Sequence, residues 1–327
     1  MTSRRYFVKG AAAFGALAAS GASFAQGAWP TKPVRVINPF PAGGGTDAFL
    51  RPLAAKMSQT FGHQLVIENL GGAGGTVGAA TAAKSAADGY TQFCGAVHHT
   101  IAESLYTRLP YSLARDFIPI TVIAYVPNVV VIHPKYTEIN TLADFLAYAR
   151  KNPGKLNFGS AGNGTSHHLT VEMFKQMTGT FMTHIPYRGA GPMMQDLLSG
   201  AVDFAFDGMG TSAAQIKAGK LKALAVTSAK RVPAFPNIPT MEEAGIKGYQ
   251  ATTWYALWAI KGAPAESVTR THDEVARQMQ DPGLKEFWFS QGAEPGGNSP
   301  ADFTRFIRSE IEKWAKVVKA SGAKIDL

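Results

Sequence analysis

The sequence predicts an α/β protein made of two lobes that are joined by a two-crossing hinge and enclose a ligand cleft. Apolar runs alternate with glycine-rich turns and helical periodicity between residues 34 and 97, and a similar pattern restarts between residues 156 and 227. An aromatic strand at Ala251–Ala259 and three helical segments then complete the first unit, so the second unit is inserted into it. Clefts between lobes are common ligand sites.

The first unit begins with a strand at Val34–Ile37, followed by the turn Pro39-Phe-Pro-Ala-Gly-Gly-Gly and a helix that starts near Asp47. A glycine-rich turn between a strand and a helix leaves several backbone N–H groups unpaired. The helix dipole adds positive potential there, so the N-terminus at Thr46–Asp47 suits an anion.

Two more strands follow in the first unit, at His63–Glu68 and Tyr90–Val97, with a second glycine-rich loop and a small-residue helix from Thr76 between them. This order predicts a parallel sheet whose loops meet at the carboxyl ends of the strands. His98, directly after the third strand, is therefore expected on the same rim as Gly43–Gly45.

The remaining elements are predicted from the same signals. Apolar runs at 117–124 and 128–133 are separated by Tyr125-Val-Pro127, and Thr141 caps a helix at 142–150. The second unit has strands at 156–158, 183–186, 202–206 and 221–227, with helices at 165–177, 192–200 and 213–218. Helices at 266–280, 283–291 and 300–321 end the chain. The predicted domains are a first lobe of residues 26–125 and 252–327 and a second lobe of residues 126–251.

The N-terminal residues 1–25 have the pattern of an export signal. Ser3-Arg-Arg-Tyr-Phe-Val-Lys9 is typical of a twin-arginine signal, and Ser23-Phe-Ala25 supplies small residues for a cleavage site. A Sec-type signal with two incidental arginines is the alternative, and either signal exports the protein. We expect a periplasmic protein that is cleaved near Ala25.

The charge pattern favours small anions as partners. The formal charge of +9 falls to +6 when the three basic residues of segment 1–25 are removed. The lysines and arginines are scattered without a basic run, which argues against nucleic-acid binding. Cys94 is the single cysteine and lies in an apolar run, so it is expected to be a buried thiol. We expect a monomer without a cofactor.

The second unit contains a matching set of polar loops. The helix N-terminus at Thr165–Ser166 would face the first one across the cleft, and a third, at Tyr187–Pro192, lies beside it. Backbone amides and side chains here could hold a carboxylate, and the polar side chains are Ser160, Asn163, Thr165 and Ser166. Arg188 is either a cationic partner or an exposed loop residue. Asp207 could accept a hydrogen bond from a ligand hydroxyl or ammonium, or hold the loops together.

An NAD(P)-dependent oxidoreductase is the main enzymatic alternative. Gly43-x-Gly45-x-x-Ala48 satisfies a relaxed dinucleotide-binding pattern, and Glu68 lies 20 residues after Ala48. The pattern fits poorly, because Pro39-Phe-Pro-Ala42 separates the strand from the first glycine and Pro41 lacks an amide donor.

Two pairs of adjacent histidines, His98–His99 and His167–His168, are the only candidates for a metal site. Together they could bind zinc, but the side chains of adjacent residues diverge, whereas helical metal ligands favour i, i+4 spacing. No metal ligand and no catalytic residue are predicted.

Ordered motifs run along nearly the whole mature chain. They include Pro39-Phe-Pro-Ala-Gly-Gly-Gly-Thr-Asp47, Gly72-Ala-Gly-Gly-Thr-Val-Gly78, Asp88-Gly-Tyr90, Ser160-Ala-Gly-Asn-Gly-Thr-Ser-His167, Pro186-Tyr-Arg-Gly-Ala190 and Gly219-Lys-Leu-Lys-Ala-Leu-Ala-Val-Thr227. They resemble the periplasmic solute-binding proteins of tripartite tricarboxylate transporters, the Bug or TctC-like receptors. The resemblance implies a periplasmic binding protein-like fold (type II) that closes on a di- or tricarboxylate or an aromatic acid.

The resemblance also implies which residues form the site. Backbone amides of the first loop and the loop from Ser160 to Ser166 would hold one carboxylate, Phe40 would line the site, and the Tyr-x-Gly-Ala loop would complete it. Ala102-Glu103-Ser104 replaces an Asn-Pro pair that the family often has before Leu-Tyr. The segment His98-His-Thr100 is expected to line the distal end of the site, where a histidine could favour a second carboxylate. The expected ligand-binding residues are Phe40, Ala42, Gly43, Gly44, Gly45, Asp47, His98, Ser160, Asn163, Gly164, Thr165, Ser166, Tyr187, Gly189, Ala190 and Asp207.

The predicted function is that of an exported receptor. It would trap a carboxylate by lobe closure and pass it to the permease subunits of a tripartite tricarboxylate transporter in the membrane. A ligand-sensing co-receptor for a two-component system is a further possibility.

Overall fold

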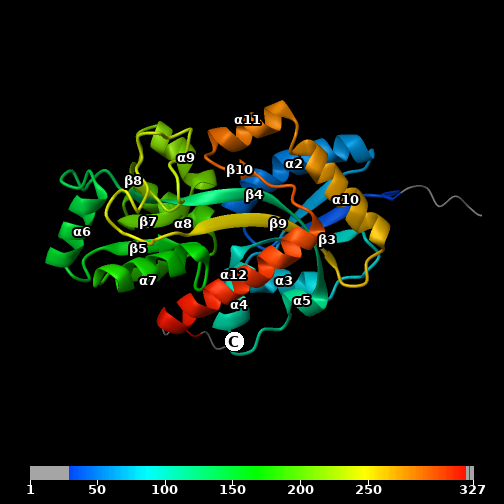
Figure 1. The fold of residues 1–327 in the computed structure, drawn as a ribbon, viewed down its shortest axis with the longest axis horizontal. Coiled ribbons are helices and arrows are strands. Elements are labelled where there is room, and N and C mark those ends of the chain that lie inside the picture. The colour runs from blue at the N-terminus through cyan, green and yellow to red at the C-terminus, as the bar shows by residue number, and fades with distance from the viewer. Residues whose placement is uncertain (1–28, 322–323, 325–327) are drawn as a thin grey trace, which may run out of the picture.

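One path of strands, β2–β1–β3–β9–β4–β7–β5–β6, organises the fold, and β10 and β8 pair with β4 off this path (Figure 1). The computed structural model describes residues 29–321 and 324, so the expected signal peptide and its cleavage site lie outside the described residues. The strands are β1 (Val34–Asn38), β2 (Leu65–Asn69), β3 (Thr91–Ala96), β4 (Phe117–Ile132), β5 (Asn157–Ser160), β6 (Thr183–Pro186), β7 (Phe204–Gly208), β8 (Lys222–Val226), β9 (Thr252–Ile260) and β10 (Glu294–Pro295). Within the described residues, no helix is long and apolar enough to cross a bilayer.

The sheet as a whole is mixed, and the parallel arrangement predicted for the first three strands is confirmed. β1 is parallel to β2 and β3, and β5 is parallel to β6 and β7, as the β–loop–α–β order requires. β9 is antiparallel to both β3 and β4, because it brings the chain back from the second unit in the opposite direction. The two lobes of the predicted fold class are present, whereas the boundaries at residues 125/126 and 251/252 stay a prediction.

β4 and β9 connect the two lobes, and they run across the middle of the view in Figure 1. Residues 117–127 of β4 pair with β9, whereas residues 128–132 pair with β7 and β8. The sequence predicted two apolar runs here, but the structure has one strand of 16 residues. Pro127 has no N–H to donate, but it does not interrupt the strand. It lies where β4 changes its partner from β9 to β7 and β8.

Helices cover both faces of the sheet. They are α2 (Gly45–Phe61), α3 (Thr76–Ala83), α4 (Val97–Leu105), α5 (Leu113–Asp116), α6 (Leu142–Lys151), α7 (Ser166–Thr178), α8 (Ala190–Ser199), α9 (Met209–Lys217), α10 (Ala265–Gln278), α11 (Pro282–Ser290) and α12 (Pro300–Ser321). Thr141 caps α6 as predicted, because its side chain accepts a hydrogen bond from the Asp144 N–H. Helix α9 starts at Met209 instead of residue 213, directly after β7.

Each strand sends alternate side chains into two hydrophobic cores, one on each face of the sheet. In β9, Trp254 and Trp258 belong to one core, whereas Tyr255 and Leu257 belong to the other. The two tryptophan rings pack on Phe303 of α12, with centroid distances of 5.9 and 5.0 Å. The C-terminal helix therefore covers one face of the hinge strands and leaves the other face to the loops.

Candidate ligand-binding site

The first glycine-rich loop leaves the N-terminus of α2 open. Gly44 is the N-cap residue and provides no side-chain cap. Gly43 has a left-handed backbone with φ of 78°, and its N–H donates to Asp47 Oδ2 at 3.0 Å. A Cβ atom on Gly45 would collide with the Tyr255 hydroxyl. The unpaired amides and the positive end of α2 therefore lie beside that hydroxyl.

The Asp47 carboxylate is fully engaged inside the first lobe. It accepts hydrogen bonds from Gly43 N–H, Arg51 Nε at 2.6 Å, Asn38 Nδ2 at 3.3 Å and Asn69 Nδ2 at 3.2 Å. Burial raises the pKa of Asp47, but the hydrogen bonds from Arg51, Gly43 and Asn69 outweigh it, so the net pKa is lowered. The Asp47 carboxylate thus fixes the conformation of the loop, and its direct contact with a ligand stays a prediction.

The hydroxyls of the second-lobe loop are also engaged internally. Ser160 Oγ lies 2.6 Å from His184 Nε2 and accepts from Gly162 N–H, while Thr165 Oγ1 donates to Gly162 O at 2.8 Å. Ser166 Oγ lies 2.9 Å from Thr253 Oγ1 of β9. Thr165 is the N-cap of α7 but does not cap it with its side chain. The backbone N–H groups at the start of α7 are therefore left for an anion.

The third loop positions α8 in the same way. Tyr187 donates its hydroxyl to Asp196 at 2.7 Å, and burial together with this bond raises its pKa to about 12. Gly189 is the N-cap of α8 with φ of 131°, and Ala190 behind it is buried. Arg188 is exposed. Because it also lines the cavity between the loops, its role as a cationic partner of the ligand stays a prediction.

The loops of the two lobes touch in this structure, so the cleft is closed. A Cβ on Gly74 would lie 2.7 Å from the Asn163 carbonyl oxygen, and one on Gly189 would lie 2.8 Å from Pro41 Cδ. A cavity of about 220 Å³ remains at the contact. Its lining includes Phe40, the second glycine-rich loop, Ala161 to Asn163 and Pro186 to Arg188.

Behind Phe40 lies a buried polar cluster formed by His98 of α4, His167 of α7 and Asp207 of β7. The Phe40 and His98 rings are 5.0 Å apart, and the His98 and His167 rings are 5.9 Å apart, measured between centroids. His167 Nδ1 lies 3.5 Å from Asp207 Oδ1, without hydrogen-bond geometry. We call these three side chains the histidine–aspartate cluster.

The cluster adjoins the open helix ends. A Cβ on Gly208, the N-cap of α9, would lie 3.7 Å from the Tyr255 hydroxyl and 3.9 Å from His167 Nε2. Because the same hydroxyl touches Gly45, the N-termini of α2 and α9 meet around it, and the His167 side chain of α7 lies beside Gly208. Burial and, to a smaller extent, Asp207 raise the pKa of Tyr255, so its hydroxyl stays protonated and can donate.

Each pair of adjacent histidines contributes one ring to the cluster and one to the scaffold. His99 contacts the backbone of Ala96 and Gly75, whereas His168 stacks on His184 with 4.0 Å between the ring centroids. Side chains of consecutive helical residues diverge, which separates the two members of each pair. Within residues 29–321, no group of three His, Cys, Asp or Glu side chains has the geometry of a metal site.

The sequence did not single out His167 and Tyr255 as site residues. A usable signal was present for Tyr255, because strand alternation places it on the same face as Thr253, which bonds to Ser166, and opposite Trp254. His167 lies in a predicted motif, but nothing in the sequence distinguishes its orientation from that of His168.

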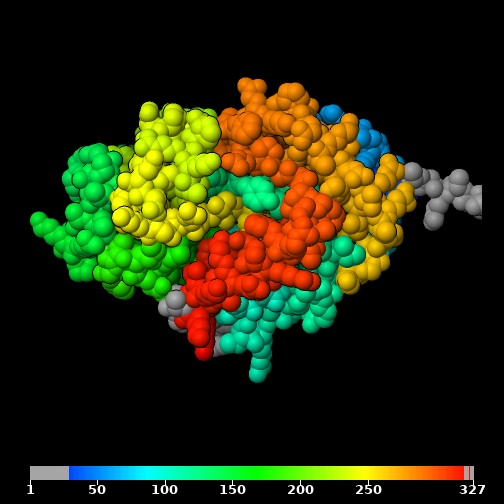
Figure 2. Space-filling model, in the orientation of Figure 1, coloured from blue at the N-terminus to red at the C-terminus, as the bar shows by residue number. Residues whose placement is uncertain are grey.

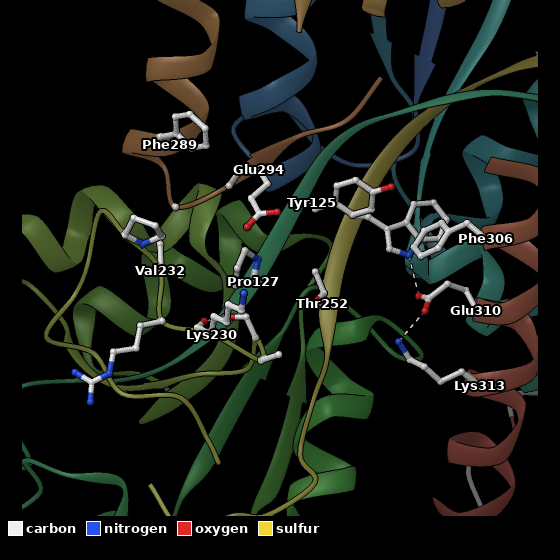
Figure 3. A pocket seen from close by; sticks show the side chains of 17 residues that line it. Tyr125, Pro127, Lys230, Val232, Thr252, Phe289, Glu294, Phe306, Glu310 and Lys313 are labelled. Carbon is white, nitrogen blue, oxygen red and sulfur yellow. Dashed lines mark hydrogen bonds and ion pairs between the residues drawn. The ribbon is translucent and has the colours of Figure 1, made fainter. Parts of the chain in front are cut away.

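A second cavity, of about 560 Å³, lies on the face of the hinge strands that α12 covers (Figure 3). Tyr125, Trp254 and Phe306 line it, and Figure 2 shows the hollow near the centre of that face. Its inner polar groups are satisfied, since Glu310 accepts from Trp254 Nε1 at 2.9 Å and pairs with Lys313 at 2.7 Å. The unpaired polar atoms of the histidine–aspartate cluster favour the closed cleft as the ligand site, in spite of its smaller cavity.

In the structure, the acidic residue of the dinucleotide-binding pattern already has a partner within the protein. Glu68, which would have to bind a ribose, is paired with Arg35 of β1. This pair ties β1 to β2 along their parallel register.

A family profile described as "Tripartite tricarboxylate transporter family receptor" matches residues 49–323. The chain belongs to this receptor family. The Bordetella pertussis protein BugT is 35% identical to this receptor over 314 residues, which are 95% of this chain and 96% of BugT. The predicted resemblance is thereby confirmed.

Solved structures of similar proteins share the receptor's fold. An R. palustris protein solved with adipate is 39% identical with a TM-score of 0.88, covering 91% of this chain and all of that chain. The periplasmic binding protein BugD is 34% identical with a TM-score of 0.87 and the same coverage. MatC from Rhodopseudomonas palustris, with bound malate, is 29% identical with a TM-score of 0.84, covering 89% of this chain and all of MatC. The family and these neighbours are substrate-binding receptors and not enzymes.

Proposed function

We propose that this receptor binds one small organic carboxylate in the closed cleft and delivers it to the membrane subunits of a tripartite transporter. The observation that carries the proposal is the meeting of two helix N-termini, those of α2 and α9, around the Tyr255 hydroxyl. Gly45 of α2 touches this hydroxyl, and Gly208 and His167 lie next to it. Unpaired amides and helix dipoles from both lobes then act on one anion, which holds the lobes together.

The hydrogen bonds within the loops support a carboxylate bound mainly by backbone groups. The hydroxyls of Ser160 and Thr165 and the Asp47 carboxylate fix the loop conformations, so the amides are positioned before the ligand arrives. The adipate and malate in the neighbouring structures are carboxylates, which agrees with this chemistry.

Delivery requires that the membrane partner distinguish the closed receptor from the open one. A ligand shifts this equilibrium only by as much as it binds the closed form more tightly. Contacts such as Gly74 to Asn163 exist only when the lobes meet, so they belong to the closed form. We further propose that the receptor is an exported periplasmic monomer, cleaved near Ala25, with lobes divided at residues 125/126 and 251/252.

A thermal-shift screen tests the proposed ligand class. The exported protein should gain several degrees in Tm with at least one di- or tricarboxylate or aromatic acid, because a ligand at 100 times its Kd stabilises by about 2.7 kcal/mol. NADH and NADPH serve as controls and should give no shift. If no carboxylate at millimolar concentration raises Tm, the proposed function is wrong.

A pair of glycine variants tests lobe closure. Gly74→Ala should lower carboxylate affinity about tenfold, since its Cβ would clash with the Asn163 carbonyl of the other lobe. Gly179→Ala is the matched control, because its φ of 64° resembles the 63° of Gly74 but no atom lies within 4 Å of its Cβ position. Both variants should lose about 1 kcal/mol of stability from the left-handed backbone. Equal affinities of the two variants would contradict closure on the ligand.

A further inference from the structure

Four buried polar atoms of the histidine–aspartate cluster have no hydrogen-bond partner among the described residues. They are His98 Nδ1, both ring nitrogens of His167, and Asp207 Oδ1. The exposed fractions of the three side chains are only 5%, 3% and 0%. Buried polar atoms in native proteins are nearly always paired, so such a group of unpaired atoms indicates a missing partner.

These atoms lie together at the inner end of the cleft. Phe40 separates them from the cavity at the loop contact, and its ring touches that of His98. The Tyr255 hydroxyl touches Gly45 at the start of α2, where the first carboxylate of a ligand is proposed to bind, and Gly208 lies near both this hydroxyl and His167 Nε2. A short ligand that spans this distance would place its far end between His98 and His167.

The chemistry of the cluster suits a second anionic group. Asp207 Oδ2 is held by the hydroxyls of Thr211 and Ser212, which directs Oδ1 towards His167 Nδ1. An imidazole with a carboxylate on one side can carry a positive charge when an anion binds to its other nitrogen. A protonated His167 would then lie between two carboxylates, that of Asp207 on one side and that of the ligand on the other.

Without a ligand, burial keeps both imidazoles of the cluster uncharged at neutral pH. Burial lowers the pKa of His167, and Asp207 opposes this only in part. Burial and the neighbouring His167 and His99 lower the pKa of His98. The titratable groups facing His167 are His98 on α4, Asp207 on β7 and Tyr255 on β9, whereas Glu172 and Lys175 of its own helix act on His168.

We infer that the ligand of this receptor carries two acidic groups, that His98 and His167 bind the second one, and that His167 takes up a proton as the ligand binds. Asp207 is the positioning residue that orients His167. The inference rests on the proposed function and selects dicarboxylates from its wider ligand class. An aromatic acid with one carboxylate would leave the four atoms unpaired, and sites built to bond a polar group strongly reject analogues that lack it.

Isothermal titration calorimetry with matched acids tests the inference. The probes are the linear dicarboxylates from malonate to adipate, the monocarboxylates of equal chain length, and benzoate. The best dicarboxylate should bind at least about 100-fold more tightly than its matched monocarboxylate and than benzoate. Titrations at pH 7.5 in phosphate and in Tris, which differ in ionisation enthalpy, should show uptake of about one proton per dicarboxylate.

His167→Gln separates the charge role from simple packing. The amide can form hydrogen bonds but cannot accept a proton, so the proton uptake should disappear and the preference for the dicarboxylate should fall to within about tenfold. The monocarboxylate affinity should stay as in the wild type, which also shows that the variant is folded. His63→Gln is the control and should change nothing, because His63 follows the far end of α2, a 17-residue helix about 25 Å long.

The outcomes separate the inference from the proposed function. If monocarboxylates or benzoate bind as tightly as dicarboxylates, or if His167→Gln keeps the proton uptake, the inference is wrong and the receptor remains a carboxylate receptor. If no acid of either kind binds, the proposed function fails.

Discussion

Asp47 and Asp207 are both buried aspartates beside the start of a helix, one in each lobe, but their carboxylates differ in what they bind. Asp47 has donors on both oxygens, from Gly43, Arg51 and two asparagines. Asp207 has two hydroxyl donors on Oδ2 and none on Oδ1, which faces His167. A carboxylate with hydrogen bonds to both oxygens stabilises a loop. A carboxylate with one oxygen that accepts no hydrogen bond can still interact with a charge that forms nearby.

Asp207→Asn should have the largest effect on binding. The amide keeps the shape of the side chain but cannot stabilise an imidazolium at His167, so dicarboxylate affinity at pH 7 should fall about 100-fold, or about 2.7 kcal/mol. Stability should not fall, because the variant removes a buried charge with an unpaired oxygen. Calorimetry gives the affinity and a thermal melt gives Tm. An affinity within threefold of the wild type would show that Asp207, like Asp47, serves only to stabilise its loop.

Asp47→Ala should affect stability more than binding. Loss of the carboxylate frees the Gly43 N–H and leaves buried asparagine donors unpaired, which should cost about 1–3 kcal/mol in the free energy of unfolding. Carboxylate affinity should fall only about tenfold, because the amides at the start of α2 remain but lose their fixed loop. Urea unfolding and calorimetry measure the two effects. A larger loss of affinity than in Asp207→Asn would reverse the comparison.

The pH dependence of His99 provides a test without ligand. Burial lowers the pKa of His99 to about 4, although its bonds to Ala96 and Gly75 oppose this. The unfolded chain takes up this proton near pH 6.5 and the folded protein only near pH 4, so stability is lost as the pH falls through this window. The contribution is at most about 3 kcal/mol. His99→Gln should therefore lose less stability than the wild type between pH 6.5 and 4.5 in urea unfolding, and equal losses would exclude His99 as a source.

The sequence predicted much of the fold, including the glycine-rich loops that precede α2, α7 and α8. The strand at Thr183–Pro186, the Thr141 cap and the buried Cys94 are as expected. These features depend on apolar periodicity, turn residues and capping side chains, which act over a few neighbouring residues. The mixed sheet and the unbroken β4 were not predicted, since they depend on partners more than a hundred residues away.

By itself, the sequence determined the family, the two-lobe fold and the glycine-rich loops at the helix N-termini. The tertiary structure alone decided which polar side chains are left open. It supplies Asp47 with hydrogen bonds from Asn38 and Asn69, and it places His167 beside Asp207 and His98 beside His167. The physical reason is that a loop's shape is set locally, whereas the partners of a buried side chain are supplied by elements that only folding brings together.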